Sequence, residues 1–142
     1  MPEKGERRHV ETRAWFIKVH HDLRTSAALR AKPPITDAAL FHCQQAVEKA
    51  LKGYLHWHGR SFPKTHQLGP LGKLCAEVDG SLELLAFRVV DLSGHAVEQR
   101  YPGEGPDPDI REARRALKLT KEVVSGIPDR LPRTVRPRGI RL

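Results

Sequence analysis

The sequence is poor in cysteine and contains no long apolar run. Its two cysteines, Cys43 and Cys75, stand among leucines and alanines without the spacing of metal ligands, so we interpret them as buried thiols in a reducing compartment. No apolar stretch approaches the ~18 residues that are needed to span a membrane. The charged N-terminal segment also lacks the apolar stretch of a signal peptide. We therefore expect a cytoplasmic protein without a membrane-spanning segment.

Acidic residues are also too few to balance the basic ones. Asp and Glu number 17 against 25 Lys and Arg, which leaves a net charge of +8. A positive protein favours an acidic partner, such as a nucleic acid, a nucleotide or an acidic protein surface. Five arginines fall between residues 130 and 141, where two prolines disfavour a helix. We interpret residues 128–142 as a flexible basic tail, which is either merely solvated or binds phosphates or a partner.

Apolar residues recur at helical spacing along most of the chain, and no segment shows the alternation of a strand. Segments rich in proline and glycine separate the helical stretches. The predicted helices span about residues 9–31, 36–58, 66–78, 80–100 and 108–125. Because short connections favour antiparallel neighbours, we predict an all-α fold, an antiparallel up-and-down bundle of four to five helices. Residues 1–8 then form an N-terminal extension, and residues 9–127 form the bundle.

The eight histidines do not show the pattern of a metal site. His20 and His21 are adjacent, and His56 and His58 lie two positions apart, so on a helix the members of each pair point in different directions. A helical zinc site needs histidines at positions i and i+4. The sequence also lacks the Gly-x-Ser-x-Gly turn of serine hydrolases and the glycine-rich loop of nucleotide-cofactor enzymes. We therefore expect neither a metal nor a cofactor.

Three segments are more distinctive than the rest of the chain. FHCQQAVEKALK (residues 41–52) is followed by THQL (65–68) and RYP (100–102). Together they resemble the HEPN domain, a nucleotide-binding domain of higher eukaryotes and prokaryotes, over about residues 10–125. The resemblance implies an antiparallel helical bundle that commonly forms a homodimer. It also implies a protein partner, because small HEPN proteins are often encoded beside a minimal nucleotidyltransferase, and such pairs include toxin–antitoxin systems.

Some HEPN proteins are metal-independent ribonucleases, and the resemblance implies where their catalytic pair would lie. Their motif is an arginine, which holds the phosphate, followed after four to six other residues by a histidine that transfers a proton. Arg88 and His95 match this spacing in the fourth predicted helix, where the family's motif would fall. Two further matches in the sequence lie outside this helix. Arg88 is followed by Val89 instead of the more usual polar residue, which argues against a nuclease.

The block of residues 41–52 admits two interpretations. In the structural one, Gln44 forms hydrogen bonds inside the bundle or across a dimer, and His66 bonds locally. Glu48 and Lys52, four residues apart, then form a pair on the helix surface. In the other interpretation, cations gather around a phosphate group, because lysine and arginine are permanent donors at neutral pH. The residues of this ligand site would be Lys49, Lys52, Lys64, His66 and Arg100.

These observations lead to one preferred function and two alternatives. The preferred one is a dimeric, nucleotide- or RNA-associated module that binds or regulates and acts with a nucleotidyltransferase partner, rather than a self-sufficient enzyme. The first alternative is a toxin-like, metal-independent endoribonuclease that uses Arg88 and His95. The second is a structural bundle whose exposed face makes an oligomer and binds no nucleic acid.

Overall fold

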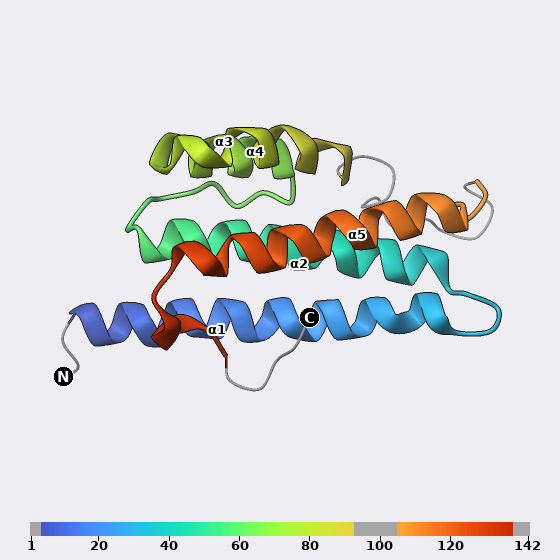
Figure 1. Ribbon diagram of the computed structural model, residues 1–142, viewed down its shortest axis with the longest axis horizontal. Coiled ribbons are helices and arrows are strands. Elements are labelled where there is room, and N and C mark those ends of the chain that lie inside the picture. Colours follow the sequence, from blue (N-terminus) through green and yellow to red (C-terminus); the bar gives the residue numbers. More distant parts are fainter. Residues whose placement is uncertain (1–3, 93–104, 138–142) are drawn as a thin grey trace.

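The computed structural model describes residues 4–92 and 105–137, and within these ranges the ordered elements are all helices (Figure 1). The predicted all-α fold is therefore confirmed. None of the helices in these ranges combines the length and the apolar character that crossing a bilayer requires. The described residues form five α-helices, which are α1 (Lys4–Thr25), α2 (Thr36–Trp57), α3 (Leu68–Val78), α4 (Glu83–Val89) and α5 (Ile110–Gly126).

Three long helices lie side by side, and a short hairpin of two helices lies along one side of them (Figure 1). α1 and α2 are antiparallel and pack along their length, and α2 also packs against α5 and α3. After α2, residues 58–67 run back along that helix as an extended segment, which we call the return loop. α3 and α4 then form the hairpin. Because the return loop runs back along α2 without a helix of its own, α5 runs parallel to α2 and antiparallel to α1 (Figure 1).

The core lies between α2 and the helices that surround it. Its largest fully buried side chains include Tyr54 and Leu51 from α2 and Phe16 from α1. Two glycines permit close helix contacts. A Cβ atom on Gly53 would lie 2.9 Å from the Cβ of Trp15, and one on Gly72 would lie 3.1 Å from the Cα of Ala86. Gly72, an unfavourable residue inside a helix by propensity alone, is thus required for the packing of α3 on α4.

Several helix ends differ from the predicted ones. α1 begins at Lys4, so part of the predicted N-terminal extension is helical, and after Thr25 the chain tightens into a 3₁₀ helix at Ser26–Arg30. The fourth helix is short in its α-helical part and continues as a 3₁₀ turn, Val90–Leu92. The remainder of that predicted helix lies outside the described residues. Periodicity locates helices well but not the point at which an α-helix tightens into a 3₁₀ turn.

The first part of the predicted basic tail packs on the bundle. Two 3₁₀ turns, Pro128–Arg130 and Arg133–Val135, carry the chain from the end of α5 across to α1 (Figure 1). Leu131 and Val135 are buried, with exposed fractions of 4% and 0%. The flexible tail inferred from arginine and proline content therefore does not describe residues 128–137, because two apolar side chains between the arginines join the core.

Candidate functional site

The polar residues of the distinctive block form a stripe along α2. Gln44, Glu48 and Lys52 follow one another at four-residue intervals, so they lie on nearly the same side of the helix. All three are buried, with exposed fractions of 0%, 4% and 9%. Burial of a carboxylate and an ammonium group is unfavourable unless each finds partners. We call these three residues the polar stripe.

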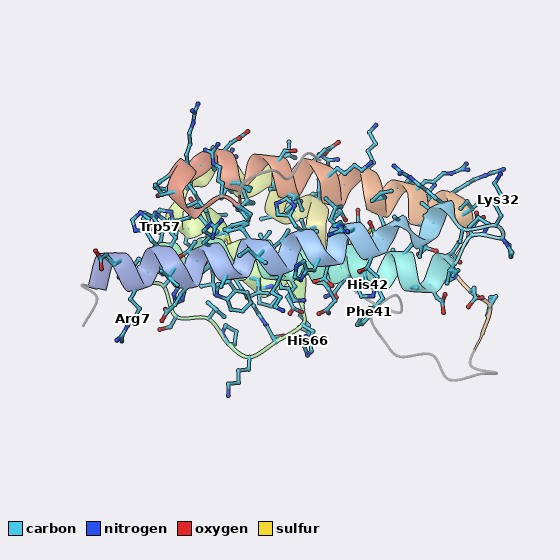
Figure 2. The ribbon with its side chains drawn as sticks, turned by 90° about the horizontal axis from the view of Figure 1, so that it is seen from below. Arg7, Lys32, Phe41, His42, Trp57 and His66 are labelled. Atoms are coloured by element: carbon cyan, nitrogen blue, oxygen red, sulfur yellow. The ribbon has the colours of Figure 1, made fainter. Side chains whose placement is uncertain are left out.

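The return loop supplies two of the four hydrogen bonds that the polar stripe forms with described residues. The Gln44 side chain donates from Nε2 to the backbone carbonyl of His66 at 2.8 Å and accepts a bond from Gln45. One carboxylate oxygen of Glu48 lies 2.9 Å from Nδ1 of His66, and the other lies 3.3 Å from Nζ of Lys52. His66 projects from the return loop toward α2 (Figure 2). The polar stripe therefore fastens the return loop to the middle of the bundle.

These contacts test the structural interpretation of Gln44, of the Glu48–Lys52 pair and of His66. The predicted hydrogen bonding of Gln44 inside the bundle is confirmed. The predicted surface pair is wrong in its location, because Glu48 and Lys52 are covered by the return loop. The predicted local bond of His66 is also wrong, because its partner, Glu48, lies 18 residues away in the sequence. Helix periodicity could not show this, since the covering segment is a loop without periodicity of its own.

A second polar cluster joins α1 to α2. The carboxylate of Asp22, a residue only 7% exposed, receives Nδ1 of His42 at 2.9 Å and also pairs with Nζ of Lys49. His42 and Lys49 are seven residues apart and therefore share one side of α2. Figure 2 shows His42 on the same side of the bundle as His66. This cluster therefore links α1 to α2 through a carboxylate with two partners.

Three of the five residues of the predicted phosphate site, Lys49, Lys52 and His66, take part in the two polar clusters. Lys49 and Lys52 are already paired with carboxylates, whereas the side chain of His66 is 74% exposed. Lys64 lies on the exposed part of the return loop, and Arg100 lies outside the described residues. Their joint binding of a phosphate group stays a prediction.

The predicted catalytic pair is only half described. Arg88 lies on α4, and its guanidinium group is 2.7 Å from the carboxylate of Glu122 on α5. His95 falls outside the described residues. The catalytic role of the two stays a prediction, and the one member that the structure describes is engaged in an ion pair between helices.

Burial shifts the pKa of both thiols and of two histidines, His20 and His58. Burial raises the pKa of the Cys75 thiol to about 12 and also raises the pKa of Cys43. Burial lowers the pKa of His20, with a smaller contribution from the neighbouring His21. Both cysteines are free and buried, as interpreted from the sequence. Among the described residues, no group of three His, Cys, Asp or Glu side chains is placed to hold a metal ion.

α5 carries five exposed cations on its outer side. Its N-terminus is capped by Asp109, which accepts a bond from the backbone N–H of Arg111 at 2.8 Å. The apolar residues of the helix face α2, which turns the long cations outward. None of these cations forms an ion pair with another described residue. We call them the basic face, which consists of Arg111, Arg114, Arg115, Lys118 and Lys121.

Comparison with known proteins gives one match. The model of the HEPN domain matches residues 12–128, which is most of the chain. Searches among curated proteins and among solved structures found no match. The matched range includes the polar stripe, the return loop and the basic face.

Proposed function

The chain belongs to the HEPN domain family, and from that premise we propose that it is a nucleotide- or RNA-binding regulatory module that acts with a nucleotidyltransferase partner. HEPN domains are usually associated with nucleotides or RNA. Within that class, the pair would resemble a toxin–antitoxin system, and the chain itself would bind and regulate rather than catalyse. The observation that carries this proposal is the basic face of α5.

The basic face has the geometry of a phosphate-binding surface. Its first and last residues, Arg111 and Lys121, are ten positions apart, which corresponds to about 15 Å along the helix axis. The two acidic residues of the helix do not cancel this charge, because Glu122 is already paired with Arg88 and Glu112 is a single carboxylate. Unpaired surface cations attract the phosphates of a nucleic acid irrespective of its sequence.

The ion pair of Arg88 favours binding over catalysis. A catalytic arginine must be free to hold the reacting phosphate. Here its guanidinium group bridges α4 to α5 through Glu122. This contact supports the regulatory module over the ribonuclease.

The apolar surface of α4 supports a protein partner, which we propose is a second copy of the chain. Leu84 and Phe87 of α4 and Val90 of the following 3₁₀ turn are exposed by 70%, 78% and 48%, and their three-residue spacing puts them on one side of this segment. Lys73 and Glu83, of opposite charge, line a hollow beside them, so two identical surfaces related by a twofold axis can pair charges around the apolar centre. Replacing Phe87 with Ser should convert the dimer to a monomer in sedimentation experiments. An unchanged dimer would contradict this interface.

The test of RNA binding uses the salt dependence of affinity. Binding of single-stranded RNA should weaken steeply with salt, with a slope of about −0.7 per phosphate neutralised. Replacing Arg114, Lys118 and Lys121 with Gln should weaken binding and flatten that slope. The matched control replaces three exposed cations outside α5, Lys18, Arg24 and Arg30, and should change the affinity less.

Two outcomes would contradict the proposal. One is that both triple variants weaken RNA binding equally, which would show that the basic face is not the RNA-binding surface. The other is RNA cleavage without metal that disappears in His95→Ala, which would favour the ribonuclease. Purification from native lysate should recover a nucleotidyltransferase, and its absence would count against that partner.

A further inference from the structure

Three arginines gather around a hollow at the end of the bundle that lies farthest from the start of α2. Arg7 and Arg8 come from the first turns of α1, and Arg60 comes from the start of the return loop. In Figure 2, Arg7 projects on the side from which the return loop leaves α2. The hollow has a volume of about 510 Å³. We call it the arginine hollow; its lining includes Arg7, Arg8, Glu11, His56, Arg60 and Phe62.

The end of α2 fixes the position of Arg60. The backbone N–H of Arg60 donates to the carbonyl of Leu55 at 2.9 Å, and that of Gly59 donates to the carbonyl of His56 at 3.1 Å. This pair of bonds is a Schellman motif, in which the residue after the helix takes a left-handed conformation. Gly59 has φ of +66°, which glycine adopts without strain. The chain therefore turns sharply and brings Arg60 beside the first turns of α1.

Arg8 lies directly over this turn. A Cβ atom on Gly59 would lie 3.3 Å from Nη2 of Arg8, so the guanidinium group rests against the bare backbone of the glycine. The arrangement depends on Gly59 twice, once for its conformation and once for its lack of a side chain. It brings arginines that are 52 positions apart in the sequence, Arg8 and Arg60, to the same hollow.

The charges of the hollow do not cancel. Glu11 is 2.7 Å from Nε2 of His56, and Arg60 is 2.8 Å from Glu77, so both carboxylates near the hollow have partners. Arg7 and Arg8 form no ion pair with any described residue. Phe62, which is partly buried, adds an apolar wall.

We propose that the arginine hollow binds a phosphate monoester, held by Arg7 and Arg8 with Arg60 at the edge. Guanidinium groups present paired donors that match the oxygens of a phosphate. The identity of the ligand as a nucleotide 5′-phosphate rests on the proposed function, whereas the phosphate site itself does not. The basic face and the arginine hollow are separate surfaces and can be tested separately.

The test follows backbone amide signals by NMR during titration of the full chain with three probes. Adenosine 5′-monophosphate and ribose 5-phosphate should shift the amide signals of Gly59, Arg60 and Ser61 in a saturable manner. Adenosine, which lacks the phosphate, should not shift them. Equal shifts with adenosine, or phosphate-dependent shifts confined to other residues, would overturn the site.

Variants then separate the hollow from the basic face. Arg7→Gln with Arg8→Gln should weaken the binding of adenosine 5′-monophosphate by about tenfold or more, because each charged hydrogen bond contributes on the order of a factor of ten. The matched control, Arg111→Gln with Arg115→Gln on α5, should leave it unchanged. RNA binding should show the reverse: the Arg111, Arg115 variant should weaken it more than the Arg7, Arg8 variant does.

A gain-of-affinity variant excludes loss of fold as the explanation. Glu11→Gln removes the negative charge that faces the hollow. It should tighten the binding of both adenosine 5′-monophosphate and ribose 5-phosphate. Unchanged affinity in Glu11→Gln and in the Arg7, Arg8 variant would overturn the proposal. If the hollow binds no phosphate but the chain binds RNA through the basic face, the proposed function stands and the hollow is refuted. If the hollow binds phosphate but the chain binds no RNA, the proposed function is refuted and the phosphate site stands.

Discussion

Glu48 shows at the scale of one residue how this protein accommodates charge in its interior. The carboxylate is 4% exposed, and each of its oxygens has a cationic or hydrogen-bonding partner within 3.3 Å. Lys52, 9% exposed, depends on it for its only ion pair among the described residues. Desolvation of two such groups is costly, so the pair is stable only while it remains complete. His66 forms the second contact of the Glu48 carboxylate and thereby attaches the return loop to α2.

Removal of the Glu48 carboxylate should therefore be strongly destabilising. Glu48→Ala leaves the ammonium group of Lys52 buried without its partner, and we expect a loss of about 3–5 kcal/mol in the free energy of unfolding. Urea denaturation followed by circular dichroism measures it. Glu77→Ala is the matched control, because Glu77 pairs with Arg60 on the surface and such pairs contribute less than about 1 kcal/mol.

A double variant tests the reason for that loss. Replacing Glu48 with Gln and Lys52 with Met removes both charges, and most of the lost stability should return because no buried charge is left unpaired. Similar losses in Glu48→Ala and Glu77→Ala would show that the return loop does not cover Glu48 in solution.

At the scale of elements, two segments without regular α-helix complete the bundle. The return loop lies along α2, and residues 128–137 cross from α5 to α1. Neither has the internal hydrogen bonds of an α-helix, so each depends on side chains that reach the bundle. The return loop is attached by polar contacts, and the C-terminal segment is attached by Leu131 and Val135.

Leu131→Ala should detach the C-terminal segment. Loss of a leucine that is 4% exposed removes apolar burial and leaves a cavity, with an expected cost of about 2–5 kcal/mol in the free energy of unfolding. The control, Val10→Ala, truncates an apolar side chain that is 69% exposed on α1 and should change stability by less than about 0.5 kcal/mol.

Limited trypsin digestion gives a second measurement of this segment. The bond after Arg130 should be protected in the wild type and cleaved faster in Leu131→Ala. Equal cleavage in both proteins would indicate that the segment is detached in the wild type.

The whole molecule separates an apolar interior from a cationic exterior. Both thiols lie in the core, on α2 and α3, while the cations of α5 and the start of α1 point outward. Burial raises the pKa of Cys75 to about 12, so at neutral pH that thiol is protonated as well as covered. Only opening of the bundle exposes the two sulfurs.

Thiol reactivity should therefore report the opening of the molecule. In native protein at pH 8, both cysteines should resist an aromatic disulfide reagent, and both should react in denaturant. A surface thiol introduced by Ser125→Cys should react at once and provides the control. Immediate reaction of two thiols in the native wild type would contradict the buried positions of Cys43 and Cys75.

Helical periodicity predicted the helices because burial of one apolar side is a property of each segment alone. Thus Phe16, Leu51 and Val124, which stand at helical spacing in three of the predicted helices, are buried. The tail residues Leu131 and Val135 were not recognised, because two isolated apolar residues among arginines and prolines show no period. The ion pairs of Asp22 in the first predicted helix could not be recognised either, since its partners lie 20 and 27 positions away.

The sequence by itself determined the fold class and the family. Both depend on local spacing: apolar residues every three or four positions, and the block of residues 41–52 followed by THQL. Only the tertiary structure decided which charges are paired. Glu48, Lys49 and Lys52 meet their partners through the return loop, α1 and α2. Arg7, Arg8 and the basic face have no ion-pair partner within residues 4–92 and 105–137. The physical reason is that pairing and burial depend on distance in space, which one segment of sequence does not contain.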